Sequence, residues 1–394
     1  MKSSEHPWRS QILLGLVLVS FAIGAGLWAG SAQQGWAPPG AREADPGFGS
    51  SSDWAKRWNW AVLDLAAREQ GERLYWDPFS GFGGPVYADP ELYVRHPAWL
   101  LFSSVDHAGA GFDALLLFSV SLLSLGLVLL GRRLGIPAPL AASVLLVPLC
   151  SMEWGARLGS GHITFLGATT WPLVCALLLF AIGHARGAST RSPLEVTLLG
   201  ALGGLALSLA PMIGGHYALP FGMLLSLIII WAAGAPRWSQ LAVLSLFILA
   251  WVVHGAPRTG RFVVDALLFV LVGLGLWKSD RLKLQILTGL GLALGLIAGS
   301  GRFLLAALGR TDEMGRIMWG LVELPPVEVI PWSHYWTPSE TRLDLGLLYA
   351  PNLYWWFGAA LGVIALLRAH SALGTAVATT SLIGLSAGNP LLPW

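Results

Sequence analysis

Apolar runs dominate the chain, and short polar turns separate most of them. The first run, Ile12 to Ala32, is unbroken and long enough for an α-helix to cross a bilayer. Similar runs recur to the end of the sequence, so the pattern predicts an all-α polytopic membrane protein with about 11 transmembrane helices. The later runs are Asp113–Gly131, Pro139–Met152, Thr164–Gly183, Glu195–Ile213, Tyr217–Ala233, Leu241–Val253, Phe262–Trp277, Leu284–Ala298, Leu347–Leu367 and Leu373–Leu385.

The first run admits two interpretations. Lys2 and Arg9 precede it, and Ser31-Ala32-Gln33 resembles a signal-peptide cleavage site. A signal core, however, is about 7–15 residues long, and this run is longer. We interpret it as an uncleaved first span whose N-terminus lies in the cytoplasm.

Basic residues follow the apolar runs at every second turn. If the N-terminus is cytoplasmic, all of these clusters are cytoplasmic too, as the positive-inside rule requires, and the C-terminus lies outside. Arg258 and Arg261 lie outside in this scheme, against the rule. The clusters are Arg132/Arg133, His184/Arg186/Arg191, Arg237, Lys278/Arg281/Lys283 and Arg368.

Most remaining polar sequence falls on the outer face. We expect one domain over residues 1–394, with a first outer loop at 33–112 and a second long outer segment at 302–345. Long loops without a repeating structure of their own tend to carry function. The sequence ends in LSAGNPLLPW directly after an apolar run, which suggests that the C-terminus is truncated and that a longer protein continues beyond it.

Composition agrees with a membrane location. The 394 residues are 55% hydrophobic and 12% charged, whereas a soluble domain is about 25% charged. A net charge of +2 does not indicate nucleic-acid binding. Cys150 and Cys175 fall in apolar runs, which argues against a disulfide framework or a cysteine metal site. The 20 tryptophans fit interfacial belts, and they also fit stacking on sugar rings.

The polar stretch from Ser50 to Pro97 is the strongest candidate for a functional site. Its first part, WAKRWNWAVLDLAAREQ, predicts a helix, with Ser52 or Asp53 placed to cap it. Capping and catalysis are equally good explanations of Asp53. The apolar positions predict an amphipathic helix lying along the membrane surface. They are Trp54, Trp58, Ala61, Val62 and Leu65.

The second part, WDPFSGFGGPVYADPELYVRHP, is rich in turn residues. Asp77-Pro78 and Asp89-Pro90 each initiate a turn, and the glycines between them lack the spacing of a phosphate-binding loop. An aspartate after the first span, a helix, and then W-D-P-x-x-G-x-G-x-P-x-x-A-D-P together resemble the first outer loop of bacterial GT-C superfamily glycosyltransferases. Within that superfamily the pattern is most similar to the YfhO-like membrane proteins. Gly161-His162 and the turn at Gly214–Tyr217 are similar to that group as well.

The resemblance implies an inverting hexosyl- or pentosyltransferase of the bacterial inner membrane. Such an enzyme moves a sugar from a polyprenyl-phosphate carrier to a lipid, glycan or protein acceptor on the extracytoplasmic face. An acidic residue at the start of the first outer loop acts there as general base or helps to hold a divalent cation such as Mg²⁺ or Mn²⁺; Asp53 matches this position. Glu153 is the one acidic residue in the next outer loop, and Glu153–His162 contains no DxD or ExD, so metal dependence stays open.

The expected chemistry also needs groups that bind the donor. A carboxylate accepts the proton of the attacking hydroxyl, and cations stabilise the phosphate that leaves, for which arginine is well shaped. Any single arginine is more often a lipid head-group anchor, and a lone histidine is more often a structural residue. The predicted substrate-binding residues are Asp77, Asp89, Glu91, Arg157, His162, His216, Tyr217, Arg302 and His334, with Arg258, Arg261, Arg310 and Arg316 as further outer arginines.

Two other classes of function stay open. A secondary transporter or lipid flippase places charges near the bilayer midplane and often has repeated halves. Here the charges within spans are sparse and no repeat is evident. A non-catalytic protein that binds lipid-linked glycans would share the fold and lack a pair of acidic residues in the second outer loop, as this chain does. All three readings make membrane lipids the surroundings, and none involves nucleic acid.

Overall fold

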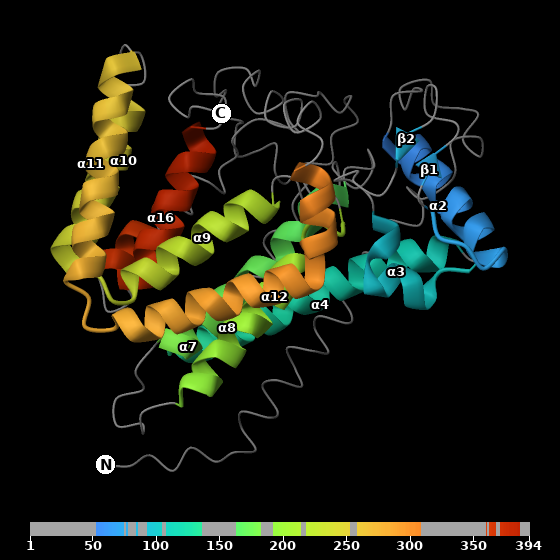
Figure 1. Cartoon of the computed structure of the whole chain (residues 1–394), viewed down its shortest axis with the longest axis horizontal. Coiled ribbons are helices and arrows are strands. Elements are labelled where there is room, and N and C mark those ends of the chain that lie inside the picture. The colour runs from blue at the N-terminus through green and yellow to red at the C-terminus, as the bar shows by residue number, and fades with distance from the viewer. Residues whose placement is uncertain are drawn as a thin grey trace, which may run out of the picture. The chain divides into compact units, whose positions relative to one another are not determined.

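The computed structural model describes residues 53–74, 76–77, 84–85, 93–104, 108–135, 163–182, 192–213, 218–252, 258–308, 360, 362–367 and 371–386 (Figure 1). Apart from one pair of two-residue strands, the regular structure in these residues is helical, which confirms the all-α prediction for this part. The chain divides into two compact units. Unit 1 holds Met1–Ala176, Leu209–Ala218 and Ser333–Leu343, and unit 2 holds Leu177–Ser208, Leu219–Trp332 and Asp344–Trp394.

Unit 1 contains the described part of the first loop and the helices that follow it. Its core combines α2, η2, α3, α4 and η4. The elements are α2 (Asp53–Glu69), β1 (Trp76–Asp77), β2 (Gly84–Pro85), η2 (Tyr93–Arg95), α3 (Pro97–Phe102), α4 (Ala108–Leu134), η4 (Ile163–Thr170) and the start of α7 (Trp171–Ile182).

Helix α2 forms where the sequence predicts it, and it begins at Asp53. Its buried side differs from the prediction. Ala61 and Leu65 lie in the core of unit 1, whereas Val62 is 59% exposed. Trp54 and Trp58 have side chains outside the described residues. This face packs against other parts of the loop, so α2 contributes to the core of unit 1; its position along a membrane surface stays a prediction.

The strands β1 and β2 form an antiparallel pair. Trp76 pairs with Pro85, and Asp77 pairs with Gly84. Trp76 and Asp77, the first two residues of the W-D-P motif, are therefore held against Pro85 and Gly84. This pairing fixes the backbone position of Asp77.

Two described helices are long and apolar enough to cross a membrane, namely Gly109–Leu134 and Leu282–Gly301. Shorter apolar helices occupy Leu166–Ile182, Pro193–Ser208, Phe221–Ala232 and Ala266–Trp277. The described residues thus support a membrane protein, while the count of about 11 spans stays a prediction.

Several helix boundaries differ from the apolar runs, and three of them concern predicted site residues or turns. Helix α11 begins at Arg258, so Arg258 and Arg261 lie in a helix rather than in a polar turn. Helix α12 continues to Leu308, so Arg302 is helical as well. The run from Thr164 starts as a 3₁₀ helix and becomes α-helical at Trp171. Pro172 suits this change, because a proline near a helix start loses no hydrogen bond.

Unit 2 is built from helices alone in the described residues, and its tightest contact is between α8 and α12. A side chain at Gly204 would meet the backbone of Leu292 and Leu296, and one at Gly295 would meet the backbone of Ala201. Later residues of α8 meet later residues of α12, so the two helices are parallel. The helices of unit 2 are the end of α7, α8 (Pro193–Ser208), α9 (Ala218–Ala232), α10 (Arg237–Val252), α11 (Arg258–Trp277), α12 (Leu282–Leu308), the helical residues 362–367 and α16 (Ser371–Ser386).

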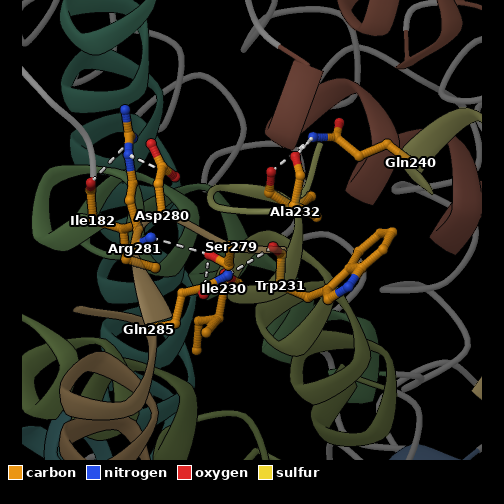
Figure 2. Close-up of polar contacts among 10 residues, drawn as sticks. Ile182, Ile230, Trp231, Ala232, Gln240, Ser279, Asp280, Arg281 and Gln285 are labelled. Carbon is orange, nitrogen blue, oxygen red and sulfur yellow. Dashed lines mark hydrogen bonds and ion pairs between the residues drawn. The ribbon is translucent and has the colours of Figure 1, made fainter. Parts of the chain in front are cut away.

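Two glutamines close the C-terminal end of α9 (Figure 2). Gln285 of α12 donates from Nε2 to the carbonyl oxygens of Ile230 and Trp231, both at 2.8 Å. Gln240 of α10 donates to those of Ala232 and Ala235, also at 2.8 Å. These carbonyls lie in or just after the last turn of α9, where a helix leaves carbonyl oxygens in need of a partner; the Trp231 oxygen also accepts from the backbone N–H of Ala235 at 3.0 Å. The two amides supply that partner from the first turns of two other helices.

Two arginines do the same for two other helix ends. Arg281 donates to the carbonyl oxygen of Ile182, which ends α7, at 3.4 Å. Arg237 donates to those of Leu366 and Leu367 at 3.1 Å. The ends of α7, α9 and residues 362–367 are therefore bonded to the starts of α10 and α12. We call the part of unit 2 formed by residues 232–240 and 277–285 the basic end; in Figure 1 it lies at the left of the view.

The glycine contact between α8 and α12 gives a direct test of this packing. Gly295→Ala should lower the free energy of unfolding by about 2 kcal/mol, because the new methyl group meets the backbone of Ala201. Gly289→Ala, in the same helix, has open space around its position and should stabilise the protein by up to about 1 kcal/mol. Thermal unfolding of both variants in one detergent checks this. Equal effects of the two substitutions would contradict the close approach of the helices.

Candidate functional site

A buried aspartate joins the two helices of the first loop. Asp64 of α2 is 5% exposed, and its Oδ2 accepts a hydrogen bond from Nε1 of Trp99 in α3 at 2.9 Å. The same oxygen forms an ion pair with Nε of Arg68, one turn later in α2, at 3.2 Å. Burial raises the pKa of Asp64, whereas the Trp99 bond and the charges of Arg68 and Arg95 act in the opposite direction. The carboxylate of Asp64 thus has one hydrogen-bond donor and one ion-pair partner within the protein.

Arg68 extends this connection to the end of α3. Its guanidinium donates to the Ser103 hydroxyl at 2.5 Å and to the Ser103 carbonyl oxygen at 3.4 Å. It also donates to the carbonyl oxygen of Leu100 at 3.4 Å. Ser103 in turn donates to the carbonyl oxygen of Trp99 at 2.6 Å. One arginine therefore ties the C-terminal end of α3 to the buried carboxylate of α2.

Three aromatic rings pack beneath these polar groups. The ring centroids of Tyr93 and Trp99 lie 4.9 Å apart at an interplanar angle of 82°. Phe112 of α4 lies 5.0 Å from Tyr93 and 5.1 Å from Trp99. Gly111 makes this approach possible, because a Cβ there would lie 2.5 Å from the Trp99 ring. The edge-to-face contacts fix Trp99 in the orientation that lets its indole reach Asp64.

Tyr93 also reaches the start of α2. Its hydroxyl donates to the backbone carbonyl oxygen of Arg57 at 2.5 Å, and burial raises the pKa of the phenol well above its ordinary value. Arg57 itself is completely buried, with its guanidinium carbon 5.5 Å from the centroid of the Trp60 ring. A buried guanidinium over an aromatic face is stabilised by the ring's negative potential. These contacts fix the first turns of α2, which begin at Asp53.

His96 caps α3 from inside the protein. Its Nδ1 accepts a hydrogen bond from the backbone N–H of Ala98 at 3.2 Å, and its ring lies 5.1 Å from that of Phe118. The residue is completely buried, and Nε2 makes no hydrogen bond in the described structure. Burial lowers the pKa of His96 to about 4. His96 is therefore a neutral cap, and Pro97 after it occupies the first helical position, where proline is favoured.

The predicted base, Asp53, lies at the start of α2. Asp53, Arg57, Asp64 and Arg68 recur at intervals of four, seven and four residues, so their backbone positions share one side of α2. Asp53 precedes Asp64 by roughly 16 Å along the helix axis. The side chain of Asp53 lies outside the described residues. What α2 provides is a fixed backbone position for it.

Most of the other predicted site residues lie outside the described part of the chain. Only the backbone is described for Asp77, in β1, and for Arg302, in α12; unit 1 holds the first of these and unit 2 the second. The residues outside are Asp89, Glu91, Glu153, Arg157, His162, His216, Tyr217 and His334, together with Arg310 and Arg316.

The sequence reasoning missed the buried polar cluster of the first loop. Two signals for it were present. Asp64 and Arg68 stand one helical turn apart, a spacing that suits an ion pair. His96 stands directly before Pro97, the arrangement of a cap followed by a proline at the first helical position. The partner of Asp64, Trp99, is 35 residues away, and no local pattern indicates it.

The arrangement separates two roles among the acidic residues of the loop. Asp64 is buried, accepts a hydrogen bond from Trp99 and forms an ion pair with Arg68, which suits a structural carboxylate. Asp53 and Asp77 stand at element ends, where loop chemistry is commonly placed. Among the described residues, no three His, Cys, Asp or Glu side chains come together as they would around a metal ion.

Comparisons with protein-family models, with curated proteins and with solved structures found no match to this chain.

The neutral cap predicts how stability depends on pH. His96 has a pKa of about 4 when folded and an ordinary value of 6.5, so the unfolded chain binds the extra proton first as the pH falls. The free energy of unfolding should therefore decrease between pH 6.5 and pH 4, by about 3 kcal/mol from this residue. Asp64, whose pKa is raised, contributes in the opposite sense at the acidic end.

His96→Asn isolates this contribution, because asparagine also caps helices and does not titrate. Thermal unfolding of both proteins across this pH range checks it. The variant should lose much of the decrease and stay close to the original protein at pH 8. The same pH dependence in both proteins would show that His96 does not titrate with folding.

Proposed function

We propose that this chain is a GT-C-like membrane glycosyltransferase that uses a polyprenyl-phosphate sugar as donor. The observation that carries the proposal is the first-loop pattern, in which a helix beginning at Asp53 is followed by W-D-P-x-x-G-x-G-x-P-x-x-A-D-P. The sugar moves, with inversion, to an acceptor on the extracytoplasmic face of a bacterial inner membrane. The enzyme is a hexosyl- or pentosyltransferase.

The packing of unit 2 supports the membrane part of the proposal. With about 11 spans that alternate in direction, α8 and α12 are the fifth and the ninth span and must run the same way. The glycine contacts between them fit a parallel pair. Helices α7 and α9 and residues 362–367 belong to the fourth, sixth and tenth spans, which end on the side where the seventh and ninth spans, α10 and α12, begin. The hydrogen bonds that join these ends to these starts agree with that order.

The first loop supports the catalytic part. In the proposed reaction Asp53 accepts the proton of the attacking hydroxyl while the bond to the sugar forms. The buried cluster of Asp64, Arg68, Tyr93 and Trp99 holds α2 in place, which keeps the base within reach of a bound acceptor. Holding a reacting group in one position removes an entropic part of the barrier.

The leaving lipid phosphate needs positive charge at the outer surface. Arg157, His162, His216 and Arg302 are the proposed donors to it, and Glu153 supports the base. Mg²⁺ or Mn²⁺ belongs to what the resemblance implies. No step of the proposal depends on it.

The test is sugar transfer by the chain reconstituted in lipid with a panel of polyprenyl-phosphate sugars. Asp53→Asn keeps the shape and capping capacity of the side chain but accepts a proton poorly, so transfer should fall by at least a hundredfold. Asp280→Asn is the matched control. Its carboxylate is 82% exposed in unit 2, and transfer should be unchanged.

Three results would tell against the proposal in different ways. Equal activity of Asp53→Asn and the original protein would make Asp53 a helix cap only. Loss of activity together with loss of thermal stability would point to folding, and the more conservative Asp53→Glu would then separate the two. If no donor in the panel supports transfer, a lipid-linked glycan binder or a transporter becomes the better description.

A further inference from the structure

The corner between α11 and α12 exposes an unusual combination of side chains. Trp277, the last residue of α11, is 82% exposed. Lys278 and Lys283 are also exposed, and neither side chain makes a hydrogen bond or an ion pair in the described part of the chain. With Arg281 and Asp280, the corner carries three cationic side chains and one anionic side chain.

The two other charged residues of the corner are used by the fold. Arg281 donates to the end of α7 and lies 4.0 Å from the carboxylate of Asp280 (Figure 2). The Ser279 hydroxyl donates to Gln285 at 2.7 Å and accepts from the backbone N–H of Arg281 at 3.1 Å. Gln285 is anchored to α9 in turn. The corner is thus held in shape, and the two lysines remain directed to the surroundings.

An apolar row begins at the same corner. Leu282, Ile286, Leu290, Leu294 and Ile297 of α12 are each between 43% and 62% exposed, and they follow one another at intervals of three or four residues. Such intervals place them on one side of the helix. The side chain that precedes this row is a tryptophan flanked by lysine. Apolar rows that end in tryptophan and lysine are typical of the boundary between acyl chains and head groups.

The other corner of the basic end repeats part of this arrangement. Arg237 and Trp238 open α10, both are exposed, and Trp238 is 51% exposed. Arg237 also donates to the ends of residues 362–367. Two exposed tryptophans with basic neighbours therefore stand at the same end of unit 2. This end has the charge and the aromatic character of a surface at head-group depth.

We propose that the α11–α12 corner binds the head group of an anionic phospholipid. Lys278 and Lys283 attract the phosphate, Trp277 lies at the head-group level, and the acyl chains run along the apolar row of α12. Charge complementarity favours an anionic lipid over a zwitterionic one. The assignment does not depend on whether the chain transfers sugars.

The experiment measures lipid binding to the full chain in neutral detergent at low ionic strength. Native mass spectrometry compares phosphatidylglycerol with phosphatidylcholine of the same acyl chains. The original protein should prefer phosphatidylglycerol. The double substitution Lys278→Gln with Lys283→Gln should weaken phosphatidylglycerol binding by roughly 25-fold. Each basic residue near an anionic surface contributes about a fivefold preference, and the two contributions multiply. Phosphatidylcholine binding should stay the same.

Two control variants sharpen the result. Lys278→Arg with Lys283→Arg keeps both charges and should keep the preference. Arg73→Gln removes an exposed charge in unit 1 and should leave lipid binding at the corner unchanged. Equal binding of the two lipids by the original protein, or an unchanged preference in the double glutamine variant, would overturn the assignment. In that case the lysines serve another partner, such as an acidic protein surface.

Discussion

Polar groups that leave water need partners within the chain, and this requirement organises both units. In unit 1 the charge of Asp64 is buried, and it is balanced by the Trp99 indole and the Arg68 guanidinium. Removing a buried partner of this kind typically costs several kcal/mol, which is why the cluster fixes α2 and α3 so firmly. In unit 2 the same requirement applies to backbone carbonyls at helix ends. Gln240, Gln285 and two arginines supply the missing donors.

The requirement also explains why the basic end has two kinds of cation. Arg281 and Arg237 donate to carbonyl oxygens, for which a branched guanidinium with several N–H groups is well suited. The lysines at 278 and 283 face outward instead. A compact, strongly hydrated ammonium is easier to keep near water at the boundary of a membrane. At the α11–α12 corner the arginine therefore has the structural role, and the two lysines have the proposed lipid-facing role.

In the described part of the chain, helices form where the apolar pattern predicts them, because a stretch without polar side chains can satisfy its backbone within a membrane only by coiling. It predicted helix ends less well. Helix α12 continues past Arg302 to Leu308, and α11 starts at Arg258, since backbone bonding does not stop at a charged residue. The helix from Asp53 was predicted together with its start. Its buried face was not, because Asp64 and Arg57 are stabilised there by Trp99, Trp60 and Tyr93, and two of these come from distant positions.

The topology predicted from the basic residues makes the first loop extracytoplasmic and the basic end cytoplasmic. The direct measurement is labelling with an impermeant thiol reagent in sealed vesicles, after Cys150 and Cys175 have been replaced by alanine. Arg73→Cys reports on the first loop, and Asp280→Cys reports on the basic end; both positions are exposed. The account predicts that right-side-out vesicles label only the cysteine at 73 and inverted vesicles only the cysteine at 280. Labelling of both from the same side would contradict it.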